Sequence, residues 1–158
     1  MSPVRFPDKT LTAIGSGRQI NLQNLGVPTV LIFHYRGTAG VARKLNNIIR
    51  DKYPASQVLV ASVLDLHSIP KLARGATETM IKREYKNAAD ELVEDQTPEE
   101  YVILIADWNG GITKSLGFKN TDKQAGIAVF DSSGYLIDKY QGDEPEDIII
   151  SFLDQSLD

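Results

Sequence analysis

The sequence contains no cysteine among its 158 residues. This absence excludes disulfide bonds, thiolate nucleophiles and thiolate metal ligands. The only histidines are His34 and His67, which are too few imidazole ligands for an ordinary zinc site. No loop has the carboxylate spacing that binds calcium. We therefore expect neither a metal nor a cofactor.

Long apolar runs and an excess of positive charge are also absent. No apolar run approaches the roughly 20 residues that cross a bilayer, and the N-terminus lacks the apolar core of a signal peptide. The net charge is −4, whereas proteins that bind phosphate backbones carry clustered lysine and arginine. These absences predict a cytoplasmic protein that binds neither membrane nor nucleic acid, unless a leader peptide has been removed.

The remaining composition is that of a globular chain with a core. Hydrophobic residues make up 42% of the sequence and charged residues 24%, and a chain of this length buries a substantial interior. No repeat, low-complexity tract or flexible linker divides it. We predict a single domain over residues 1–158, with a helical insertion at about residues 68–97.

Buried strands alternate with amphipathic helices along most of the chain. Continuous β-rich apolar runs predict strands covered on both faces, and these runs lie at residues 29–33, 58–64 and 101–106. Apolar residues at helical spacing predict four helices, which lie at about residues 41–53, at 69–93 with a break at Gly75, at 112–117, and after Pro145.

Two hairpins complete the pattern. Residues 11–14 and 19–22 flank a glycine turn, and residues 127–130 and 135–140 flank the turn Asp131–Gly134. The order is a hairpin followed by βαβαβαββα. Strands that alternate with helices predict an α/β three-layer sandwich, and the closing hairpin makes its central sheet mixed.

Three stretches resemble the thioredoxin-like superfamily. The segment VLIFHYRGTAGVARKL (30–45) is similar to the strand, turn and helix that carry the Cys-x-x-Cys motif of thioredoxins. The segment FPDKTLTAIGSGRQINLQNLGVPTVLIF (6–33) resembles the opening of redoxins and peroxiredoxins, and GIAVFDSSGYLIDKYQG (126–142) resembles their closing hairpin. The resemblance implies a thioredoxin-like (redoxin) fold. Within it, the chain is most similar to the cysteine-free, YtfJ-type redoxin-like proteins.

The chain also differs from the thioredoxin pattern at several positions. On the thioredoxin pattern, Ala39 and Ala42 stand at the two thiol positions, Thr38 replaces the usual tryptophan, and Ala125 replaces the family's cis-proline. Thiol exchange and thiol peroxidase chemistry both need a thiolate. The resemblance therefore implies the fold without that activity, and we assign no catalytic residue.

The helix start after Phe33 is the first candidate site. Free backbone N–H groups at Thr38, Ala39 and Gly40 and the positive end of the helix dipole favour an anion. Arg36 and Arg43 would add charge-assisted hydrogen bonds. The alternative is an ordinary helix, capped by Thr38 and flanked by solvated arginines.

Other polar residues follow the ends of the predicted core strands. His34 suits a base or a pH sensor, or it is a hydrogen-bonded structural residue. Asp65 and His67 are spaced to form a polar pair, although an N-terminal cap for the next helix also explains them. Trp108 lies in a glycine-bounded loop, where ligands of open α/β sheets bind, although packing against the next helix also explains it.

The leading hypothesis is a non-catalytic binding module for a protein partner or a small anion at the helix start. One alternative is a structural or regulatory subunit that forms a homodimer or a hetero-oligomer through residues 68–97. Another is an enzyme in which Thr38 activates a bound thiol such as glutathione, assisted by His34, Tyr35 and Arg43.

Overall fold

The computed structural model describes residues 3–157. Its central sheet is mixed and five-stranded. In spatial order the strands are β5 (Leu104–Asp107), β4 (Leu59–Asp65), β3 (Thr29–His34), β6 (Gly126–Phe130) and β7 (Leu136–Gln141). The central strand β3 pairs in parallel with β4 and antiparallel with β6. This arrangement confirms the predicted order of strands and the mixed sheet.

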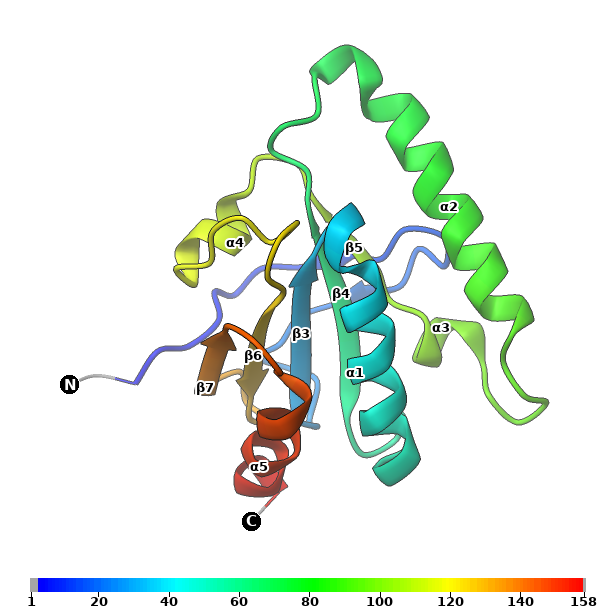
Figure 1. Cartoon of the computed structure of the whole chain (residues 1–158). Coiled ribbons are helices and arrows are strands. Elements are labelled where there is room, and N and C mark those ends of the chain that lie inside the picture. Colours follow the sequence, from blue (N-terminus) through cyan, green and yellow to red (C-terminus); the bar gives the residue numbers. More distant parts are fainter. Residues whose placement is uncertain (1–2, 158) are drawn as a thin grey trace.

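The two faces of the sheet are covered differently, which makes three layers (Figure 1). One face carries α1 (Ala39–Lys52) and α5 (Glu146–Leu157). The other face carries α4 (Gly111–Ser115) and the predicted N-terminal hairpin, formed by β1 (Leu11–Thr12) and β2 (Gln19–Ile20).

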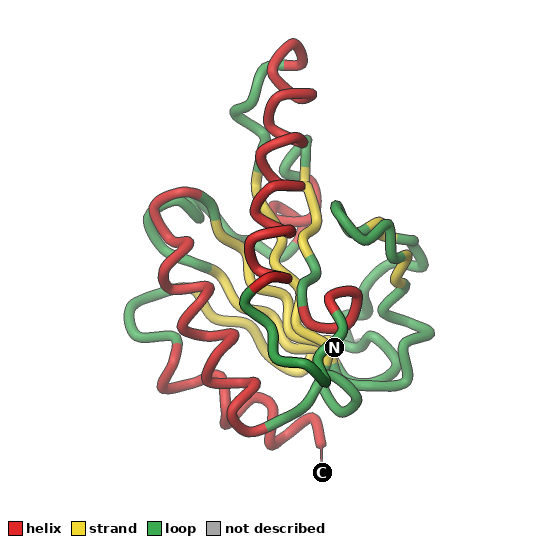
Figure 2. The backbone as a smooth tube through the Cα atoms, turned by 90° about the vertical axis from the view of Figure 1, so that its right-hand side faces the viewer, coloured by secondary structure: helices red, strands yellow, loops and turns green. Residues whose placement is uncertain are grey.

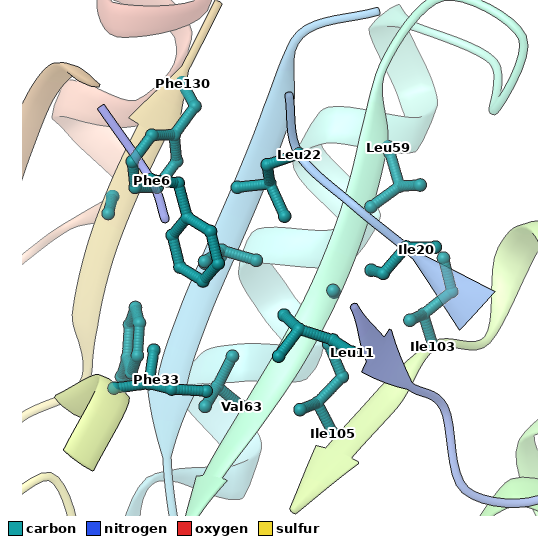
Figure 3. Packing of buried hydrophobic residues seen from close by; sticks show 14 of the residues in the cluster. Phe6, Leu11, Ile20, Leu22, Phe33, Leu59, Val63, Ile103, Ile105 and Phe130 are labelled. Carbon is teal, nitrogen blue, oxygen red and sulfur yellow. The ribbon is translucent and has the colours of Figure 1, made fainter. Parts of the chain in front are cut away.

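The alternation of β3 side chains explains why its middle residues, Val30 to Phe33, are all apolar. Val30 and Ile32 pack in the cluster that includes Leu45 and Ile49 of α1. Residues Leu31 and Phe33 point to the opposite face, into the cluster with Phe6, Leu11 and Leu22, which Figure 3 shows above the strands. Every residue of β3 is buried, as expected for a strand with both faces covered.

Two details of the predicted elements are wrong. Gly75 does not break the second long helix, because it lies in the first turn of α2 (Arg74–Asp90), directly after the 3₁₀ turn η2 (Lys71–Ala73). The third core strand does not begin at Tyr101, because Pro98 starts a short helix, α3 (Pro98–Tyr101). Proline suits a first helical turn, where its missing N–H would have no partner.

Helix α2 stands beside the β5 edge of the sheet, between α1 on one face and the hairpin on the other (Figures 1 and 2). The ring of Tyr85 packs directly on Gly15 in the hairpin turn. Because α2 does not lie flat on the sheet, residues of β4 and β5 that face α1 are only half-buried; they include Ser62, Leu64 and Leu104. Within residues 3–157, no helix combines the length and the apolar character needed to cross a membrane.

Candidate functional site

Thr38 joins the helix start to a distant loop. A 3₁₀ turn, η1 (Arg36–Thr38), connects β3 to α1, and Thr38 occupies the N-cap position without a side-chain capping bond. Its hydroxyl accepts a hydrogen bond from the Tyr35 N–H at 3.1 Å and donates one to the Thr121 carbonyl. Thr38 is 3% exposed. Its hydroxyl is therefore engaged in structure and is not presented to a ligand.

The loop that precedes β6 covers this side of the helix start. The carbonyl of Asp122 lies so close to Gly37 that no Cβ fits there, and the Thr121 carbonyl already meets Thr38. Carbonyl oxygens carry negative partial charge and disfavour an anion at the same place. Ala125, at the position of the family's cis-proline, is buried after a trans peptide bond, like every peptide bond that the structure describes.

The two alanines that the thioredoxin pattern aligns with thiol positions border a groove on the opposite side of α1. Ala39 is exposed and Ala42 is buried, and both line this groove. It has a volume of about 570 Å³ and lies between α1, α2 and the uncovered part of β4 and β5. That volume lies within the range of small-molecule binding sites.

The walls of the groove differ in chemical character. The floor comes from the sheet and is mostly apolar, with Val60, Ser62, Leu64 and Leu104. The α1 wall carries cations and amides, with Arg43, Asn46, Asn47 and Arg50. The α2 wall carries apolar and acidic groups, with Met80, Ile81, Glu84 and Glu91 at its end.

His34 lines the groove at the end of β3. It is 8% exposed, and neither ring nitrogen has a hydrogen-bond partner among residues 3–157. Burial away from water lowers the pKa of His34 to about 4. The imidazole is therefore neutral near pH 7, where one ring nitrogen is a donor and the other an acceptor.

Arg50 lines the groove near the other end of α1. Its Nη1 donates to the Val58 carbonyl at 2.8 Å, and its guanidinium stacks over the Tyr101 ring at 5.0 Å. Nε and Nη2 are buried without a hydrogen-bond partner in the part of the chain that the structure describes. Burial lowers the pKa of Arg50, but a guanidinium keeps its charge in proteins.

A second, smaller cavity of about 240 Å³ lies at the carboxyl ends of the core strands. Here Nδ1 of His67 lies 2.7 Å from Oδ1 of Asp65, which confirms the predicted polar pair. Tyr35 and Thr121 complete part of its wall. The buried carboxylate orients an exposed imidazole, and within residues 3–157 no hydroxyl group is hydrogen-bonded to His67.

Trp108 contacts Arg74, the first residue of α2. The guanidinium of Arg74 lies 5.3 Å from the centre of the Trp108 ring, and Nη2 of Arg74 donates to Asn109 at 3.3 Å. Trp108 is half-buried and is not part of the groove wall. The observed partner of this tryptophan is therefore Arg74 of α2, and its predicted packing against the next helix stays a prediction.

The structure thus separates the predicted site residues into groups. His34, Arg36, Ala39 and Arg43 lie together at one end of the groove. Thr38 and Ala125 lie on the side of the helix start that faces the loop before β6, and Trp108 lies against the start of α2. Gly40 is exposed in the first turn of α1 and does not line the groove.

Arg50 and the sheet floor were missed from sequence. Arg50 sits among other polar residues at the end of a helical pattern, which is indistinguishable in sequence from a solvated arginine. No sequence signal indicates that α2 leaves the floor uncovered.

Comparison with solved structures places the chain in a broad class. It is similar to the exposed lipoprotein thioredoxin Etrx1 of Streptococcus pneumoniae, with 18% identity, 94% of this chain and 99% of that chain covered, and a TM-score of 0.64. It is similar to BsSco, of the Sco family of cytochrome c oxidase assembly proteins, with 15% identity, coverage of 98% and 95%, and a TM-score of 0.60. DsbF of MTB gives 16% identity, coverage of 94% of both chains and a TM-score of 0.59.

At these identities the likeness shows the fold alone. The chain has the α/β thioredoxin-like fold, with a mixed five-stranded sheet and an N-terminal hairpin. Because it contains no cysteine, it has no thiol redox activity. No protein-family model matches the sequence, and no curated protein does.

Proposed function

We propose that the protein is a non-catalytic binding module that takes a small anionic ligand in the groove between α1 and α2. The groove opens beside Ala39, at the former active-site helix start. The lack of cysteine and the short polar turn after β3 support grouping the chain with the cysteine-free, YtfJ-type redoxin-like proteins. Thr38 is engaged with Tyr35 and Thr121, which argues against an enzyme that uses its hydroxyl to activate a thiol.

The observation that carries this proposal is the uncovered apolar floor beside a cationic wall. Leu64 and Leu104 are half-buried on a sheet face that neighbouring helices cover elsewhere. Removing apolar surface from water is favourable by about 25 cal/mol per Å². A ligand with an apolar body is therefore stabilised on this floor, whereas the carbonyls of Thr121 and Asp122 lie against the loop side of the helix start.

The charge of the entrance supports an anionic ligand. Arg36 and Arg43 lie at the groove entrance, and α1 has no acidic residue in its first turn. Neither arginine has an ion-pair partner within 4.0 Å among the described residues. This end of the groove therefore favours an anion, whereas the acidic residues Glu84 and Glu91 lie on the opposite wall, along α2.

A fluorescent dye tests the groove directly. The probe is 8-anilinonaphthalene-1-sulfonate, which combines an apolar ring system with one negative charge. We expect saturable binding to the full chain and at least fivefold weaker binding to Ser62→Phe, whose ring occupies the floor. The matched control is Ser151→Phe on the exposed side of α5, with circular dichroism to verify folding.

The proposal predicts a difference between these two variants. Equal dye affinity in Ser62→Phe and Ser151→Phe would show that the dye binds elsewhere. Absence of saturable binding to the unmodified chain would remove the proposal altogether.

A further inference from the structure

The groove has a partly buried cation, Arg50, at the end farthest from Ala39, which we call its inner end. Arg50 lies eleven positions after Ala39 on α1, and at a rise of about 1.5 Å per residue this separation spans about 16 Å. Arg43 is seven positions before Arg50 on the same helix, which places the two arginines about 10 Å apart along α1. The groove is elongated along α1, with a mostly apolar floor between its two ends.

The hydrogen bonds of Arg50 are incomplete. The Val58 carbonyl satisfies Nη1, and the Tyr101 ring covers one face of the guanidinium. Nε and Nη2 have no partner within residues 3–157, although both are shielded from water. A buried charge is costly unless it is paired and hydrogen-bonded. These two nitrogens form one edge of the guanidinium, and that edge matches the two oxygens of a carboxylate.

The surrounding residues supply no counter-charge. Glu84 and Glu91 lie on the α2 wall and are exposed, and neither forms an ion pair with Arg50 within 4.0 Å in the described chain. The polar neighbours on α1, Asn46 and Asn47, are neutral amides. The inner end of the groove therefore offers one positive charge and an unused pair of donors.

We propose that the ligand is an elongated apolar monocarboxylate whose carboxylate binds Nε and Nη2 of Arg50. Its apolar body lies along Val60, Leu64 and Leu104 toward Ala39. This inference rests on the proposed function of the groove and specifies its ligand class. Arg43 and Arg36 act at the entrance, where they attract the anion before it reaches Arg50.

Isothermal titration calorimetry on the full chain tests the ligand class. The probes are decanoate and 1-decanol, which share the apolar chain and differ in the head group. We expect decanoate to bind at least tenfold more tightly than decanol. Arg50→Gln should abolish this preference while decanol affinity changes less than threefold. Lys44→Gln, which removes the same charge from α1 outside the groove wall, should retain the preference.

Arg43→Gln locates the carboxylate independently. We expect this variant to keep the tenfold preference, because Arg43 lies at the entrance. If the preference disappears in Arg43→Gln and persists in Arg50→Gln, the carboxylate binds at the helix start and the inference is overturned.

The unmodified chain keeps the inference testable even if Arg50→Gln fails to fold. Equal affinity for decanoate and decanol would overturn the choice of a carboxylate, while groove binding would stand. Dye binding without binding of either probe would likewise overturn the ligand class alone. Absence of saturable dye binding would refute the proposed function and this inference with it.

Discussion

Replacing Thr38 with valine tests whether its hydroxyl holds the helix start against the loop before β6. Valine keeps the volume and branching of threonine but removes the hydroxyl. The Tyr35 N–H loses its acceptor, and the Thr121 carbonyl loses its donor, at a position that is 3% exposed. The hydroxyl also lies 3.2 Å from the Tyr35 carbonyl, but its single proton is donated to only one carbonyl at a time, so the perturbation amounts to two hydrogen bonds.

The expected magnitude follows from those two bonds. A buried polar group left without a partner costs about 1–3 kcal/mol, and two such groups give a loss of about 3 kcal/mol in the free energy of unfolding. For a domain of this size, 1 kcal/mol shifts Tm by about 2–4 °C, so Thr38→Val should melt about 6–12 °C lower. Thr38→Ser keeps the hydroxyl and loses one methyl group, which costs about 1 kcal/mol.

Urea unfolding followed by circular dichroism, together with thermal melts, measures both variants. The ordering of parent, Thr38→Ser and Thr38→Val by stability is the decisive result. A Thr38→Val variant as stable as the parent would refute a structural role for this hydroxyl. Dye binding in the groove should be unchanged in either variant, because Thr38 does not line it.

Two further predictions concern other parts of the fold. The pKa of His34 is lowered from 6.5 to about 4 in the folded chain. As the pH falls, the unfolded chain therefore binds a proton at this histidine before the folded chain does. The free energy of unfolding should decrease by up to about 3 kcal/mol as the pH drops from about 6.5 to 4. His34→Gln should flatten this dependence in urea titrations at several pH values; an unchanged slope would contradict the buried neutral imidazole. Gly15 has φ +100° and meets the Tyr85 ring, whereas Gly17 has φ +74° and open space. Gly15→Ala should therefore lose about 3 kcal/mol and Gly17→Ala about 1 kcal/mol, and equal losses would argue against Tyr85 packing on the hairpin.

The fold was predictable because each core strand is encoded locally. The run at 29–33 begins with threonine and is apolar from Val30 to Phe33, which is the pattern of a strand covered on both faces. The turn Asp131–Gly134 also identified its hairpin correctly. The errors fall at the ends of elements, where local signals conflict. Glycine at position 75 suggests a helix break, but a glycine is tolerated in the first turn of a helix, where it lies. Tyr101 is typical of a strand, but it ends the short helix that Pro98 begins.

The site was predictable only in part, because it depends on contacts between distant segments. Sequence placed the helix start and the alanines at the thiol positions. It gave no sign that the Thr38 hydroxyl reaches Thr121, which is 83 positions away. The sequence also did not indicate that Arg50 and Ser62 line one groove, because this groove forms only in the space between α1 and α2.

The position of α2 also affects how the sheet meets other molecules. An edge strand carries unpaired backbone groups that can recruit a strand from another chain. At β5 the Ile14 N–H donates to the Leu104 carbonyl at 2.8 Å, and α2 stands alongside (Figure 2). Because α2 stands beside β5 instead of lying on the sheet, it leaves one face of the sheet uncovered. In the same position it hinders another chain from pairing with β5, and so it disfavours aggregation.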